Sequence, residues 1–238
     1  MSDELNEVQR RSIRRDAIGL GIGTGAYALS FGALSVSAGL SIWQTQALSL
    51  LMFTGASQFA LIAILGAGGG AVVAIATAAL IGSRNAFYSV TMASVLRPRG
   101  WRRLAAAQLT IDESTGMAVG HDETNAGARL AFWSTGVAIF ICWNIGTLIG
   151  AVGAGLLDDP AVLGLDAAGP AAFLALIWPR LTSWPMRAVF VVSLVTAVAF
   201  TPFLPPGIPV LIAGAAGVAI GLLLALPELR RGTGGDAA

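Results

Sequence analysis

The sequence predicts an all-α fold: a polytopic helical membrane protein with about seven membrane segments. Of its 238 residues, 55% are hydrophobic and only 11% are charged, which leaves too little polar surface for a soluble globule. Apolar runs long enough to cross a bilayer alternate with short arginine-rich stretches. The lipid bilayer is therefore the expected surrounding, and no nucleic-acid partner is expected.

The chain divides into three parts in this interpretation. Residues 1–16 form a cytoplasmic N-terminal tail, residues 17–227 a single transmembrane transport domain, and residues 228–238 a cytoplasmic C-terminal tail. At about 1.5 Å per residue, each apolar run of the domain is long enough to cross. The expected segments cover residues 17–38, 45–65, 70–96, 130–154, 161–178, 188–203 and 208–226.

Glycines at helical spacing predict close helix packing. The first segment carries two overlapping G-x-x-x-G pairs, formed by Gly19 with Gly23 and by Gly21 with Gly25. Gly146 and Gly150 repeat the pattern in a later segment and suit contact with a second membrane helix, either of this chain or of a partner.

The second segment carries three polar residues near its centre. Thr54, Ser57 and Gln58 have the spacing i, i+3, i+4, which places them on one face of a continuous helix. They either form interhelical hydrogen bonds or line a polar site, and the sequence leaves both interpretations open.

The third segment, residues 70–96, is expected to be broken or re-entrant, because Gly82-Ser83-Arg84-Asn85 interrupts its apolar run. A guanidinium cannot be deprotonated, so Arg84 must have a partner, a water-filled cavity or a ligand. Backbone exposed by a broken helix is tolerated where it lines a cavity. Arg84 is thus predicted to bind substrate, with Asn85 and Tyr88 one turn beyond, and with Gln58, Ser57 and Thr54 opposite.

The next polar residues allow three roles. Asp112 and Glu113 are either ion-pair partners of Arg84 or proton-coupling groups, unless they are solvated on a cytoplasmic helix. A pairing with Arg84 would simply hold two segments together, and then Arg84 would not bind substrate. Residues 104–128 are either an interfacial helix or a partly inserted segment.

Arginine distribution predicts the topology. Thirteen of the fourteen arginines lie on the cytoplasmic side if both termini and the 97–129 stretch are cytoplasmic, and the exception is Arg84. Three apolar segments precede Arg97, whereas this topology requires an even number of crossings. A reversal of the chain direction near residues 82–85 would make the number of crossings before Arg97 even.

Motifs of catalysis and of metal binding are missing. The sequence has no G-x-S-x-G, H-E-x-x-H, Walker or CxxC pattern, and the single cysteine, Cys142, cannot form an intramolecular disulfide. His121-Asp122-Glu123 is interpreted as a solvated loop, since three consecutive residues do not converge on one ion. No enzyme activity, cofactor or metal is expected.

Several blocks resemble the AzlC family of branched-chain amino acid permeases. They are Phe53-Thr54-Gly55-Ala56-Ser57-Gln58-Phe59, Ser83-Arg84-Asn85-Ala86-Phe87-Tyr88-Ser89 and Leu109-Thr110-Ile111-Asp112-Glu113-Ser114, in order along the chain. Ser83 and Asn85 depart from the asparagine and histidine usual there, and Ile111 is inserted between threonine and aspartate. The resemblance implies export of hydrophobic amino acids with a small second subunit of the AzlD type.

Together these observations predict a multi-pass protein of the inner, cytoplasmic membrane that exports branched-chain amino acids as a secondary transporter. Ion-gradient coupling is the default because no nucleotide-binding motif is present. The alternatives are a membrane channel and a partner-binding membrane subunit that does not transport.

Overall fold

The computed structural model describes residues 5–156, 174, 177–178 and 181–232, and the described residues form helices and no strands. The all-α class is confirmed. Four helices are long and apolar enough to cross a membrane: Glu7–Ser37, Ala71–Leu96, Asn125–Ala154 and Ile208–Ala225. Ala56–Gly66 and Trp184–Phe200 are shorter apolar helices. The segment expected at 161–178 lies, apart from three residues, outside the described part.

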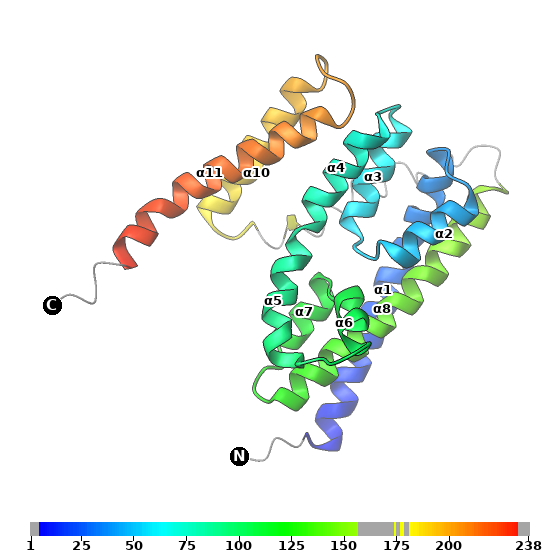
Figure 1. Ribbon diagram of the computed structural model, residues 1–238, viewed down its shortest axis with the longest axis vertical. Helices are drawn as coiled ribbons and strands as arrows, with labels where there is room; N and C mark the ends of the chain where they lie inside the picture. The colour runs from blue at the N-terminus through cyan, green and yellow to red at the C-terminus, as the bar shows by residue number, and fades with distance from the viewer. Residues whose placement is uncertain (1–4, 157–173, 175–176, 179–180, 233–238) are drawn as a thin grey trace.

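Helices α1 (Glu7–Ser37) and α8 (Asn125–Ala154) pack side by side along the molecule (Figure 1). A Cβ added to Gly146 would collide with the carbonyl oxygen of Gly25, and one added to Gly150 with that of Leu29. The two backbones therefore approach too closely for any side chain at these positions. The predicted packing is confirmed for Gly21 and Gly25, whereas an added Cβ at Gly19 or Gly23 would meet nothing within 4 Å. Gly146 and Gly150 pack inside this chain and do not offer their face to a partner.

The second apolar segment does not cross. It forms α2 (Ile42–Leu51) and α3 (Ala56–Gly66), separated by residues 52–55, and Gly55 has φ 59° and ψ −86°, a conformation outside the helical region. α2 begins shortly after α1 ends at Ser37, and α3 ends with Gly66 beside Ala38. Chain entry and exit thus lie at the same end of the molecule (Figure 1). The segment is a re-entrant hairpin.

The third segment crosses without reversing, contrary to the expected turn near residues 82–85. α4 (Ala71–Gly82) and α5 (Arg84–Leu96) are interrupted at Ser83 alone, whose φ of −58° and ψ of −25° are helical. The backbone hydrogen bond from Ser83 N to Ala79 O, 2.9 Å, continues the helix. Ala71–Leu96 is one 26-residue candidate span. The even number of crossings before Arg97 therefore comes from the α2–α3 hairpin.

A second hairpin enters from the other end. Its helices are α6 (Arg102–Leu109) and α7 (Asp112–Val119). Arg129 Nε donates to Val95 O at 3.0 Å, which joins the start of α8 to the end of α5. Residues 97–124 therefore begin and end at one level, and α6 and α7 fold back from that level into the bundle.

The tips of the two hairpins meet inside the molecule. Gln108 Nε2, near the end of α6, donates to Leu50 O, near the end of α2, at 2.8 Å. In Figure 1, α2 and α3 occupy one half of the main bundle, α6 and α7 the other half, and α4 followed by α5 spans both. Both hairpins thus stop at mid-depth.

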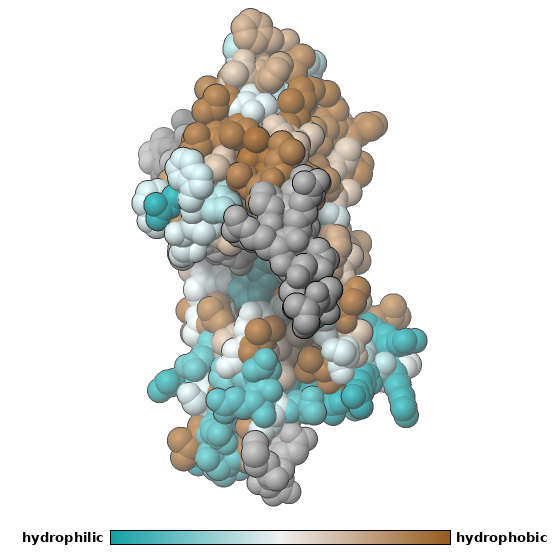
Figure 2. Space-filling view, turned by 90° about the vertical axis from the view of Figure 1, so that its left-hand side faces the viewer, coloured by the Kyte–Doolittle hydropathy of each residue, from teal (hydrophilic) through white to brown (hydrophobic). Residues whose placement is uncertain are grey.

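Helices α10 (Trp184–Phe200) and α11 (Ile208–Gly232) pair with each other beside α4. Their connecting turn packs Gly207 onto the side chains of Val73 and Ile64. That places the turn at the end opposite to the 97–101 loop. Figure 2 shows hydrophilic residues gathered around the lower end of the molecule, where α1 begins and the 97–101 loop lies, and apolar residues above. We call this lower end the arginine-rich end.

Candidate functional site

A cavity of about 730 Å³ lies where the two hairpin tips meet α1, α5 and α8. α1 contributes small residues and Tyr27, the first hairpin its tip, α5 its first residue, and the second hairpin the start of α7. Its lining residues are Gly19, Leu20, Gly23, Thr24, Tyr27, Phe53, Thr54, Gly55, Ala56, Ile81, Arg84, Ile111, Asp112, Glu113, Ile139, Trp143 and Ile177.

An ion pair crosses this cavity between the first residues of α5 and α7. Arg84 Nη2 lies 2.9 Å from Asp112 Oδ2, and the two side chains are 34% and 18% exposed. The sequence left open whether Asp112 or Glu113 pairs with Arg84, and the structure forms the pair with Asp112. Arg84 therefore has a charged partner without any break in the helix before it.

One contact joins the pair, and each of the two side chains keeps a polar atom that can form a further hydrogen bond. Arg84 Nε and Asp112 Oδ1 are buried and have no hydrogen-bond partner among the described residues. A guanidinium presents five donors and a carboxylate two oxygens, so a bidentate partner for each is geometrically available.

Two helix N-termini point into the same cavity. Gly55 and Ala56 at the start of α3, and Ile111 and Asp112 at the start of α7, line it. The two termini are built alike: the backbone N–H of the residue before each helix donates to a side-chain oxygen three residues on. The acceptors are Gln58 Oε1 for Gly55 N, at 3.1 Å, and Ser114 Oγ for Ile111 N, at 3.1 Å. Each N-terminus carries roughly half a positive charge from the helix dipole.

The charges of the described lining nearly balance. Among the described residues, Arg84 is the one cation of the lining, and Asp112 and Glu113 are its two anions. These side chains together carry one net negative charge, and two helix dipoles add about one positive charge. The described part of the site is near neutral, with its positive and negative groups separated in space.

The remaining wall is apolar and aromatic. Ile81, Ile111 and Ile139 line it together with Tyr27 and Trp143, whose ring centroids are 5.8 Å apart in an edge-on arrangement. Tyr27 Oη and Trp143 Nε1 are buried and have no hydrogen-bond partner among the described residues. Sequence analysis missed both residues. The available signal was an aromatic residue four positions after Gly23 on a glycine-rich helix.

The polar residues predicted on the second segment have different positions from those expected. Thr54 lines the cavity from the tip, but it precedes α3, so the i, i+3, i+4 face does not exist. Gln58 is fully buried, and besides holding Gly55 N it donates from Nε2 to Leu48 O at 3.2 Å, which ties α3 to α2. Ser57 is buried against Gly82 and is not part of the lining. Of the three, only Thr54 faces the cavity.

Asn85 and Tyr88, predicted to extend the site along α5, lie outside the lining. Asn85 Oδ1 is buried without a hydrogen-bond partner in the described part of the chain. Arg84 is therefore the contribution of α5 to the cavity. Within the same described part, no group of three or more His, Cys, Asp or Glu residues is placed to hold a metal ion.

Comparison with known proteins gives one match. The sequence model of a protein family described as "AzlC protein" matches residues 19–157, more than half of the chain. The matched stretch contains every residue of the cavity lining except Ile177. No curated protein matches the chain, and no solved structure matches it. The matched stretch and the membrane-spanning helices agree, and the chain is a multi-pass membrane protein that belongs to the AzlC family.

Proposed function

We propose that the protein is a secondary transporter that exports hydrophobic, branched-chain amino acids across the cytoplasmic membrane, and that it binds them in the cavity between the hairpin tips. The observation that carries the proposal is the singly joined pair of Arg84 and Asp112, whose Nε and Oδ1 have no partner in the described structure. These two atoms offer opposite charges to one ligand.

An amino-acid zwitterion matches this arrangement. Its carboxylate would accept two parallel hydrogen bonds from Arg84, supported by the N-terminus of α3, as in transporters whose discontinuous helices bind substrate carboxylates. Its ammonium would donate to Asp112, with Glu113 nearby in the lining. The near-neutral charge of the cavity favours a zwitterion over an anion or a cation.

The apolar wall supports a hydrophobic substrate side chain. Ile81, Ile111 and Ile139 would contact an aliphatic group, and a group of valine or leucine size gains about 1.5 to 3 kcal/mol when fully buried. A charged substrate side chain would find no further opposite charge in this lining. The proposed selectivity for branched-chain amino acids therefore rests on the wall and on the family.

Coupling to an ion gradient completes the proposal. The sequence has no nucleotide-binding motif, so a gradient is the energy source that remains. Asp112 and Glu113 are the acidic groups of the cavity and are proposed to take part in coupling. A proton bound to Asp112 would weaken its attraction both to Arg84 and to a substrate ammonium, so proton binding and substrate binding would be linked at this residue.

Efflux of a panel of labelled amino acids, from cells and from proteoliposomes with an imposed gradient, tests the function. A channel would equilibrate the substrate but would not move it against its own gradient. A subunit that does not transport would show no flux.

Substitution of Arg84 tests the site. Arg84→Lys keeps the charge but loses the two parallel N–H donors of the guanidinium. We therefore expect substrate binding to be weaker by about 1 to 3 kcal/mol. Arg84→Ala combined with Asp112→Ala removes both charges and should remain inactive while reaching the membrane. The matched control is Arg14→Lys, which changes an exposed arginine outside the cavity. Restored transport in the double variant would show that the pair is structural and that the substrate site is elsewhere.

A small membrane subunit of the AzlD type is the proposed partner. The glycines first considered for that contact are occupied by α1, so a partner would have to use another face. Co-purification in mild detergent tests this proposal. Transport at full rate by the chain alone would remove the need for a partner.

A further inference from the structure

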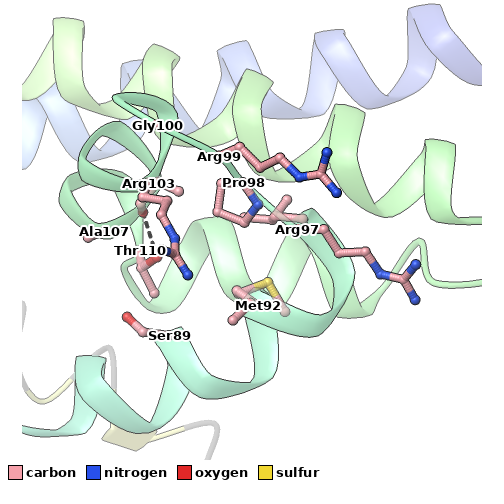
Figure 3. A pocket seen from close by; sticks show the side chains of 12 residues that line it. Ser89, Met92, Arg97, Pro98, Arg99, Gly100, Arg103, Ala107 and Thr110 are labelled. Carbon is pink, nitrogen blue, oxygen red and sulfur yellow. Dashed lines mark hydrogen bonds between the residues drawn. The ribbon is translucent and has the colours of Figure 1, made fainter.

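A second cavity, of about 570 Å³, opens between α5 and α6 at the arginine-rich end (Figure 3). Its lining shares no residue with the cavity at the hairpin tips. Three arginines form its rim, Arg97 and Arg99 from the loop after α5 and Arg103 from α6. Figure 3 shows Arg103 lying beside Thr110 and Ser89, whereas Arg97 and Arg99 extend outward from the loop.

The rim is positively charged without compensation. Among the residues that the structure describes, no aspartate or glutamate lines this cavity. In the described part of the chain the ion pairs join Arg15 with Asp16 and Arg84 with Asp112, so none involves a rim arginine. Three arginines around one opening give it a positive potential, and an anion bound there would be stabilised.

The backbone at the rim is unusual. Arg97 has φ 45° and is the non-glycine residue with a positive φ among the described residues. This conformation is disfavoured for a residue with a Cβ, and glycine is the residue that normally ends a helix in this way. An arginine directly follows α5 in spite of that cost, and its Nε donates to Ser94 O at 3.2 Å, which points to a use for its side chain.

Below the rim the cavity is apolar. Met92, Leu96 and Ala106 form its floor, with exposures of 2%, 8% and 5%. The small side chains of Ala93 and Ala107 leave the groove between α5 and α6 open to the outside. Trp101 and Leu104, 74% and 77% exposed beside it, are typical of the boundary between headgroups and hydrocarbon.

We propose that this cavity binds an anionic phospholipid, with the phosphate held by Arg97, Arg99 and Arg103 and an acyl chain lying on the floor of Met92, Leu96 and Ala106. Guanidinium forks match phosphate oxygens, and basic pockets between membrane helices bind anionic headgroups. An acidic protein segment would satisfy the charges but would not require a buried apolar floor directly beneath them. This inference does not depend on what the protein transports.

Lipid retention by the purified full-length chain tests the charge half of the proposal. Native mass spectrometry compares phosphatidylglycerol with phosphatidylcholine of the same acyl chains. We expect the wild type to retain phosphatidylglycerol, and Arg99→Gln with Arg103→Gln to weaken its binding about thirtyfold, the scale for two basic residues at an anionic surface. The matched control, Arg11→Gln with Arg14→Gln, removes two exposed arginines at the same end but outside the cavity. An equal loss in the control would show that the overall positive charge of this end retains the lipid, without a specific site, and would overturn the proposal.

Filling the groove tests the acyl-chain half without changing any charge. Ala93→Leu places a larger side chain in the opening, and Ala86→Leu makes the same change at an exposed position of α5 outside this lining. We expect Ala93→Leu alone to reduce phosphatidylglycerol retention.

Two outcomes would contradict the lipid assignment. Normal retention in Ala93→Leu, together with thermal stabilisation by inorganic phosphate that needs Arg99 and Arg103, would identify a free-phosphate site. Co-purification of an acidic polypeptide that depends on the same arginines, without lipid discrimination, would identify a protein site. Either result would overturn the lipid assignment.

Discussion

The two re-entrant hairpins are built alike at their tips but differ in charge. Each follows a crossing segment, stops at mid-depth and begins its second helix at the cavity. In each, a side chain at the third helical position accepts from the backbone N–H before the helix, Gln58 in α3 and Ser114 in α7. The shared cap shows that the same local solution satisfies an interrupted backbone on both sides of the molecule.

The two hairpin tips differ in charge and in backbone conformation, and these differences suit them to different roles. The α2–α3 tip has no charged residue and turns through Gly55 at φ 59°, whereas Ile111 at the other tip has an ordinary φ of −128° and precedes Asp112 and Glu113. A neutral tip presents a dipole that does not change with proton or substrate binding. The attraction between a charged tip and Arg84 changes when a proton or a substrate binds to the carboxylate of that tip. We infer that the first hairpin supports the ligand through a fixed helix N-terminus, whereas the second binds it through Asp112 and responds to it.

The largest expected effect concerns the sides from which the hairpins enter. In a variant without Cys142, a cysteine at position 68, after α3, should be labelled from outside the cell. A cysteine at position 100, before α6, should be labelled only from the cytoplasm, because the arginine-rich end is predicted to be cytoplasmic. A membrane-impermeant maleimide makes this an all-or-none measurement. Labelling of position 100 from outside would invert the topology, and labelling of both from one side would contradict the opposed hairpins.

Gly55→Ala should break the neutral tip. A Cβ there finds only an ordinary contact of 3.7 Å with Trp143, so the cost comes from the positive φ and is about 1 to 3 kcal/mol of stability. Ile111→Ala at the corresponding position needs no such conformation and should lose only packing. Thermal unfolding in detergent, with transport measured alongside, compares the two. Equal losses would contradict the assignment of strain to the first tip alone.

Asp112→Asn should remove the responsive charge while keeping the size of the side chain. Breaking a fully buried pair costs about 3 to 5 kcal/mol, but Arg84 is 34% exposed and water compensates in part, so we expect about 1 to 2 kcal/mol. Thr54→Val at the neutral tip is the matched change and should cost less. Substrate affinity measured across a pH series should lose its proton dependence in Asp112→Asn only. An unchanged pH profile would exclude Asp112 as a coupling group.

Gln108→Ala should have the smallest effect, because it removes one hydrogen bond between the tips, the bond to Leu50 O at 2.8 Å. We expect about 0.5 to 1.5 kcal/mol of stability, with a larger relative loss in transport rate if the tips move together. Gln46→Ala is the control, since it removes a hydrogen bond to Asn144 away from the tips. Equal transport in both variants would show that the tips are not coupled through this bond.

The membrane class, the helical fold and the importance of Arg84 follow from the sequence alone. Apolar content and arginine distribution are properties of local composition, and a buried guanidinium requires a partner in any fold. The requirement for a reversal before Arg97 also follows from counting segments. The sequence even narrows the partner of Arg84 to Asp112 or Glu113, because charged residues are rare at membrane depth.

Tertiary structure decided which segment reverses. The run of 45–65 and the run of 70–96 are both long and apolar, and composition cannot distinguish a crossing from a hairpin. The reversal depends on one backbone conformation at Gly55, supported by the bonds of Gln58 to Gly55 N and Leu48 O. The charge of Arg84 is met by Asp112, a residue distant in sequence, while Ser83 keeps a helical backbone. Tyr27 and Trp143 reach the cavity only because α1 and α8 pack closely enough to bring them there. These outcomes depend on contacts between segments far apart in the chain, which local composition does not encode.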